Sequence, residues 1–124
     1  MNNNRPVNLD LTKFSFPLPA LTSIVHRVTG VALFVGVAIL MYALDLSLSG
    51  EEGFKAVKEC FDTFLVKLIV WGIVSALLYH LVAGFKHLIM DLGIGETLEG
   101  GILGAKLTIV ISAILIVLAG VWLW

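Results

Sequence analysis

The chain has 124 residues, of which 59% are hydrophobic and only 14% are charged. Soluble domains contain about 45–50% apolar residues even when glycine is counted, and the core of a chain this small cannot hide so much more. The formal net charge is −1 and the chain has no run of basic residues, so nucleic acid is not an expected partner; the single cysteine excludes an internal disulfide and a CxxCH haem attachment. The composition therefore predicts an integral membrane protein.

Three apolar stretches follow a polar N-terminal tail, residues 1–22, which lacks the pattern of a secretory signal. Pro17 and Pro19 are expected to keep the chain extended just before the first helix. Each stretch reaches the roughly 20 residues that cross a hydrocarbon core about 30 Å thick, and lipid forces it to be helical. The predicted fold class is therefore an all-α membrane protein in a single domain. Its three transmembrane helices are expected at about 23–48, 64–90 and 102–124.

Lysine and arginine residues favour a cytoplasmic N-terminus. Five of them lie on the side of the tail and the second loop, against three on the side of the first loop. The positive-inside rule counts these cations and ignores the acids. The C-terminus at Trp124 is then expected on the outer side. The two groups are Arg5, Lys13, Arg27, Lys86 and Lys106, and Lys55, Lys58 and Lys67.

The second expected helix carries His80 and His87, seven residues apart. Seven residues are close to two helical turns, so both imidazoles face the same way, with His80 about 10 Å deeper in the membrane. Gly72, Ala76 and Gly84 share a row with His80 and allow another backbone, or a flat group, to approach closely. His80 is therefore expected to face the protein interior and not lipid.

The inner end of the first helix supplies further polar residues in "SIVHRVTG", residues 23–30. Ser23 and Arg27 are four residues apart and share a helical face. In the predicted orientation, one group of side chains is expected to converge near the cytoplasmic interface, above His80. The members of this group are Ser23, His26, Arg27, Lys86, His87 and Asp91.

Each of these residues also has a simpler interpretation. Lysines near span ends commonly extend their ammonium groups to the interface, which would explain Lys67, Lys86 and Lys106. Interfacial residues such as Arg27 can simply anchor a helix end, and His26 and His87 can do the same. A deep histidine can also form a hydrogen bond with a neighbouring helix.

The combination favours a non-covalent haem b site. The neutral imidazole of His80 is a suitable axial ligand for haem iron, and Arg27 is suited to the propionates at the polar edge. Electron-transfer haems usually have two strong axial ligands, and this chain has one deep histidine. The second ligand must therefore come from another polypeptide, or from a second copy in a homodimeric cytochrome b. A hetero-oligomer is the preferred interpretation, because three helices alone enclose a haem poorly.

At these residues the sequence resembles the larger membrane-anchor subunit of succinate dehydrogenase, the cytochrome b subunit of complex II. The likeness is to the bacterial type, in which two three-helix anchors hold one haem. It covers nearly the whole chain in order. The matching stretches are "RPVNLDL" (5–11), "SIVHRVTGV" (23–31), "SLSGEEGF" (47–54), "VKLIVWGIVSALLYHLVAGFKHLIMDLG" (66–93) and the final apolar span.

The resemblance implies a subunit of a succinate:ubiquinone oxidoreductase in the bacterial inner membrane, with a periplasmic C-terminus. Its implied partners are a second small anchor, an iron–sulfur subunit and a flavoprotein. The resemblance makes His80 the haem ligand, with the second ligand from the partner anchor. It places ubiquinone at Ser23, Ile24 and Arg27. The haem propionates fall near His26 and Arg27, with His87 close by.

This chain is not expected to oxidise succinate itself, because it has no dinucleotide motif for flavin and no cysteine cluster for iron–sulfur. A different class of function stays open at this point: a haem-free membrane scaffold or small transporter subunit, in which His80 and Arg27 handle protons or substrate. The helices lack the inverted repeat or broken span that transporters use.

Overall fold

The computed structural model describes residues 17–124 and contains four helices in this range. They are α1 (Leu18–Leu48), α2 (Glu51–Phe61), α3 (Phe64–Asp91) and α4 (Leu98–Leu123). α1, α3 and α4 are long and apolar enough to cross a membrane. The predicted all-helical fold with three membrane helices is confirmed, and the chain is a multi-pass membrane protein.

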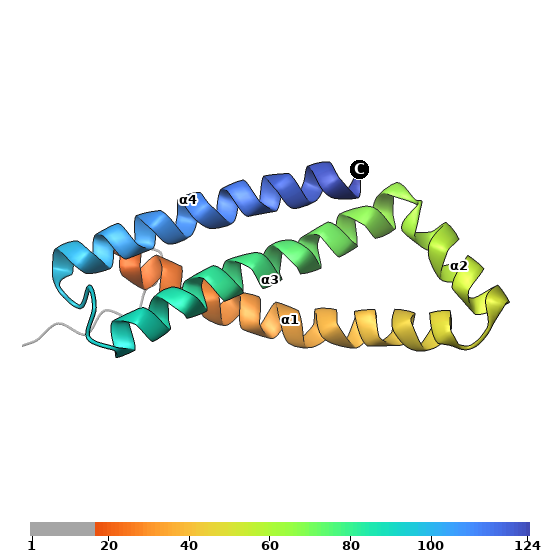
Figure 1. Ribbon diagram of the computed structural model, residues 1–124, viewed down its shortest axis with the longest axis horizontal. Coiled ribbons are helices and arrows are strands. Elements are labelled where there is room, and N and C mark those ends of the chain that lie inside the picture. The colour runs from red at the N-terminus through yellow and green to blue at the C-terminus, as the bar shows by residue number, and fades with distance from the viewer. Residues whose placement is uncertain (1–16) are drawn as a thin grey trace, which may run out of the picture.

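The three long helices lie alongside one another, and α3 contacts both α1 and α4 (Figure 1). The start of α1, the end of α3 and the start of α4 meet at one end of the molecule. α2 joins α1 to α3 at the other end. This arrangement places the N-terminal part of α1 beside the C-terminal half of α3, where the sequence concentrates its polar residues.

Burial in this bundle is the reverse of that in a soluble protein. The buried residues are small or polar, namely Thr22, Gly36, Ala83, Gly101, Ala105, Thr108 and Ser112. Large apolar side chains point outward instead, for example Phe34, which is 85% exposed, and Trp122, which is 82% exposed. Small residues between membrane helices let the backbones approach closely, while apolar side chains face lipid or other subunits. The fold therefore suits a hydrocarbon surrounding.

Two helices begin earlier than the sequence analysis expected. Pro17 is extended, with φ −64° and ψ 153°, but Pro19 already lies in the first turn of α1. A proline is tolerated there because the first N–H groups of a helix have no partner within it. The expectation that Pro19 precedes the helix is therefore wrong. α4 begins at Leu98, after Thr97 caps its first turn by accepting from the Gly100 amide at 3.0 Å.

The segment that joins the first two membrane helices contains α2. This helix has Glu51 and Glu52 in its first turn and Lys58 near its end, which complement the helix dipole. Most of the expected tail, including "RPVNLDL", falls on residues 1–16 and lies outside the described residues.

Candidate functional site

The imidazole of His80 is held by two oxygen atoms of α1. Its Nδ1 lies 3.0 Å from the backbone oxygen of His26 and 3.1 Å from Oγ1 of Thr29. The hydroxyl of Thr29 donates its own proton to the same His26 oxygen at 2.8 Å. A carbonyl oxygen can only accept, so these contacts assign the proton of a neutral His80 to Nδ1. Nε2 then keeps its lone pair and can coordinate a metal ion.

Close approach of the two helices at this point depends on glycine. A Cβ at Gly30 would lie 3.1 Å from Cε1 of His80, tighter than ordinary van der Waals contact. One turn earlier on α1, the ring of His26 stacks on that of His80, with centroids 4.1 Å apart and planes 11° apart. A Cβ at Gly84 would lie 3.4 Å from Nε2 of His26. Residues 26–30 therefore pack against α3 through the imidazole of His26 and the backbone of Gly30.

A second hydrogen bond joins the same helices beside this contact. The hydroxyl of Tyr79 donates to the backbone oxygen of Thr22 at 2.8 Å. Tyr79 precedes His80 directly, and Thr22 lies four residues before His26, so the two links are about one helical turn apart on α1. Together they fix the position of α1 relative to α3 over the segment that carries the expected site residues.

The structure leaves the expected quinone residues on the surface of the chain. Ser23, Ile24 and Arg27 are exposed on α1. Within residues 17–124, neither the Ser23 hydroxyl nor the Arg27 guanidinium forms a hydrogen bond or ion pair. Both groups are therefore free, among these residues, to contact something outside the chain.

The expected convergence of six polar side chains is only partly seen. His80 was expected beneath this group, and the ring of one member, His26, stacks on the ring of His80. His87 is exposed and lies 3.6 Å from Asp91, one turn further along α3. Lys86 turns to α4, where its Cδ lies 3.3 Å from the position that a Cβ on Gly104 would take. The stem of Lys86 therefore packs on α4 and not on α1.

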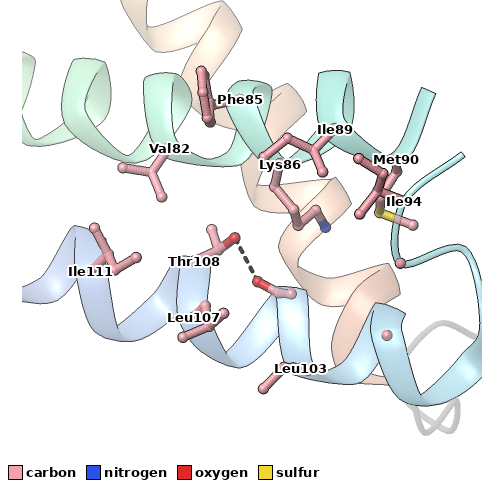
Figure 2. Close-up of a pocket in the computed structure, with 13 residues that line it drawn as sticks. Val82, Phe85, Lys86, Ile89, Met90, Ile94, Leu103, Leu107, Thr108 and Ile111 are labelled. Atoms are coloured by element: carbon pink, nitrogen blue, oxygen red, sulfur yellow. Dashed lines mark hydrogen bonds between the residues drawn. The ribbon is translucent and has the colours of Figure 1, made fainter. Parts of the chain in front are cut away.

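A cavity of about 410 Å³ lies between α3 and α4. Figure 2 shows Lys86 and Thr108 among otherwise apolar lining residues such as Val82 and Leu107. The Thr108 hydroxyl donates to the Gly104 oxygen at 2.8 Å, so it has no second proton to donate to a molecule in the cavity. None of the expected haem or quinone residues lines this cavity. It is separate from the site at His80.

The donor set at His80 fits a haem better than a metal held by several side chains. Within residues 17–124, no three histidine, cysteine or acidic side chains are close enough to hold a metal ion together. One imidazole with a free Nε2 and a hydrogen-bonded Nδ1 is the arrangement that metal-ligating histidines usually show. The residues present therefore fit one axial position of a haem.

Sequence reasoning missed the part that Thr29 plays. A threonine three residues after His26 is a usable signal, because Ser and Thr hydroxyls commonly bond to the carbonyl of the preceding turn. Such a bond places the hydroxyl next to whatever that carbonyl binds. The identity of the partner, Nδ1 of His80, depends on the packing of α1 against α3.

Comparisons with known proteins agree with one another. Residues 1–119 match the family model for the succinate dehydrogenase/fumarate reductase transmembrane subunit. The chain is 46% identical to the succinate dehydrogenase cytochrome b556 subunit of Coxiella burnetii over 100% of both chains. It is 34% identical to the cytochrome b556 subunit of Paracoccus denitrificans, covering 93% of this chain and 88% of that one.

A mitochondrial relative extends the match beyond bacteria. The succinate dehydrogenase cytochrome b560 subunit of Sus scrofa is 36% identical over 90% of this chain and 70% of the relative. The family match covers α1, α2, α3 and nearly all of α4. By its sequence and its three membrane helices, this chain belongs to the family of succinate dehydrogenase/fumarate reductase transmembrane subunits.

Proposed function

We propose that this chain is a haem-binding membrane anchor of a succinate:ubiquinone oxidoreductase, the larger of two anchors. The observation that carries the proposal is the state of His80, whose Nδ1–H is bonded to the His26 oxygen while its Nε2 has no hydrogen-bond partner among residues 17–124. The names of the relatives, which are cytochrome b subunits of succinate dehydrogenase, agree with it.

In this proposal Nε2 of His80 would hold the iron of haem b, and a second anchor subunit would supply the other ligand. The rings and cations near the inner end of α1 and α3, from His26, Arg27 and His87, form the region that receives the propionates. Haem b, when bound, supplies one-electron redox chemistry. The chain's part is to orient the imidazole and to exclude water from it with the apolar helix faces around it.

The quinone site is proposed on the exposed inner face of α1. Ser23 and Arg27 lie four residues apart there, and Ile24 adds an apolar wall. The Ser23 hydroxyl would donate a hydrogen bond to a quinone oxygen. The Arg27 guanidinium would stabilise the negative charge that develops as the quinone is reduced, in surroundings of low dielectric. Protons reach this end of the helix from cytoplasmic water over a short distance.

The remaining parts of the enzyme belong to other chains. A flavoprotein oxidises succinate and an iron–sulfur subunit passes its electrons to ubiquinone at the membrane, so this chain has no succinate-oxidising activity alone. We place it in the bacterial inner membrane, with a cytoplasmic N-terminus and a periplasmic C-terminus. The exposed apolar faces of α1 and α3 are available to the second anchor.

A difference spectrum of the detergent-extracted complex tests the proposal. Dithionite-reduced minus oxidised spectra of the wild type should show a low-spin b-type haem, and His80→Ala should lose or alter it. The matched control is Lys67→Gln, which changes a polar residue of the same helix thirteen positions before His80 and should keep the wild-type spectrum. A wild-type complex without haem would overturn the proposal and favour a haem-free scaffold.

A further inference from the structure

The hydroxyl of Thr29 occupies an unusual position among the hydroxyls of the bundle. Thr22, Ser47 and Ser49 on or beside α1 each bond to a carbonyl of the preceding turn, which is the ordinary way to satisfy a hydroxyl in a helix. Thr29 makes this bond too, at 2.8 Å to the His26 oxygen. Among the serines and threonines that the structure describes, it is the one whose hydroxyl also reaches a side chain of another helix, Nδ1 of His80 at 3.1 Å.

Three atoms thus form a closed triangle with two protons to share. The Thr29 proton lies on the His26 oxygen, so the lone pairs of Oγ1 are left to face Nδ1 of His80. The Nδ1–H then points at two acceptors, the carbonyl at 3.0 Å and the hydroxyl oxygen at 3.1 Å. A shared hydrogen bond of this kind is common in proteins. The opposite tautomer would set a bare Nδ1 against the lone pairs of the His26 carbonyl.

We infer that Thr29 is a positioning residue for the haem ligand: its hydroxyl oxygen shares the Nδ1–H of His80 with the His26 carbonyl, supports the tautomer that this carbonyl sets and strengthens Nε2 as a donor. The inference rests on the proposed function, which makes His80 an axial ligand. A second acceptor on Nδ1–H increases the electron density of the ring, and hydrogen bonds of this type raise the basicity of metal-ligating histidines. A stronger donor favours the oxidised iron, so Thr29 keeps the reduction potential of the haem low.

Four variants of the complete complex test this assignment. Thr29→Val replaces the hydroxyl with a methyl of similar size, and Thr29→Ser restores the hydroxyl. Tyr79→Phe is the matched control, because it removes the neighbouring α3–α1 hydrogen bond, 2.8 Å long, without touching His80. Thr29→Ala serves with Thr29→Ser as a second pair, since both lack the γ-methyl and they differ only in the hydroxyl.

The readout is the midpoint potential of the haem in a redox titration of the membrane complex. Thr29→Val should raise the potential, changing the reduced-to-oxidised ratio at a fixed poise by about threefold to tenfold, as expected for the loss of one hydrogen bond. For a one-electron couple this corresponds to about 28 to 59 mV. Thr29→Ser and Tyr79→Phe should stay at the wild-type potential.

Several results would overturn the inference. A wild-type potential in a haem-loaded Thr29→Val complex would remove the role of the hydroxyl. An equal shift of the haem potential in Tyr79→Phe would mean that the Thr29→Val effect comes from general packing of α1 on α3 and not from the hydroxyl. If Thr29→Val fails to assemble, the Ser and Ala variants decide, and equal potentials in these two would reject the role. Absence of haem from the wild type would instead reject the proposed function on which the inference rests.

Discussion

Gly30 of α1 faces the imidazole of His80 of α3 so closely that a Cβ added to Gly30 would lie 3.1 Å from Cε1 of the ring. The ring has little freedom to retreat, because its Nδ1 is bonded to the His26 oxygen on the same helix as Gly30. The ring of His26 also stacks on it at a centroid distance of 4.1 Å. The position of the imidazole is therefore set by backbone approach as much as by hydrogen bonding.

Gly30→Ala is expected to disturb the haem spectrum, because either His80 or α1 must move by a few tenths of an ångström. Gly72→Ala is the control, since a Cβ at Gly72 would meet nothing in the chain within 4 Å. Reduced-minus-oxidised spectra and the haem-to-protein ratio of both purified complexes are the measurement. Equal spectra for Gly30→Ala and the wild type would show that the contact does not constrain the ligand.

Ser23→Ala and Arg27→Leu are expected to impair quinone reduction. Loss of a group that stabilises developing negative charge commonly costs about 10²-fold or more in turnover, and Arg27 should show the larger effect. Succinate oxidation with an artificial acceptor should remain, since it occurs in another subunit. Lys106→Gln, which removes an exposed cation of α4, is the control and should retain both activities. A parallel fall of both activities in Arg27→Leu would indicate a role in assembly.

Trp71→Phe is expected to destabilise the α3–α4 pair. The Trp71 indole donates to the backbone oxygen of Ile116 at 2.9 Å, and a hydrogen bond of this kind contributes about 0.5–1.5 kcal/mol. The haem spectrum should be unchanged, because Trp71 lies about two and a half turns from His80. Thermal unfolding of the complex in detergent measures the effect. Trp122→Phe, at a position that is 82% exposed in the chain, is the control, and equal destabilisation by both changes would contradict the assignment.

The orientation of the chain is testable through Cys60, its single cysteine. Cys60 is exposed on α2, at the end of the bundle opposite the start of α1. With a cytoplasmic N-terminus, α2 lies on the periplasmic side. A membrane-impermeant maleimide should therefore label Cys60 in spheroplasts, and Cys60→Ser should remove the label. Labelling only after the membrane is permeabilised would reverse the orientation.

The three membrane helices could be predicted from the sequence, because a lipid surrounding forces long apolar stretches to form helices. Three apolar stretches of sufficient length leave few alternatives to membrane helices, and α1, α3 and α4 confirm this. Helix α2 was missed because it is too short and too polar for a span. Its charge pattern, with Glu51 and Glu52 at the start and Lys58 near the end, was a signal for a helix.

The site was less accessible to sequence reasoning than the fold. Helical spacing indicated that His80 faces a neighbouring helix, and it does face α1 through His26 and Thr29. The same spacing did not show that the stem of Lys86 packs on α4. The direction of Lys86 depends on where α4 packs, and Gly104 offers it a place that no spacing along α3 encodes.

The links from α3 have a consequence for how this family varies. Tyr79, His80 and Trp71 all donate from side chains of α3 to main-chain oxygens, of Thr22, His26 and Ile116. A backbone oxygen is the same whichever amino acid carries it. Substitutions on α1 and α4 can therefore change lipid contacts or partner surfaces while these acceptors persist. A substitution of Trp71, Tyr79 or His80 removes a donor, so we expect these three positions of α3 to vary least among members of the family.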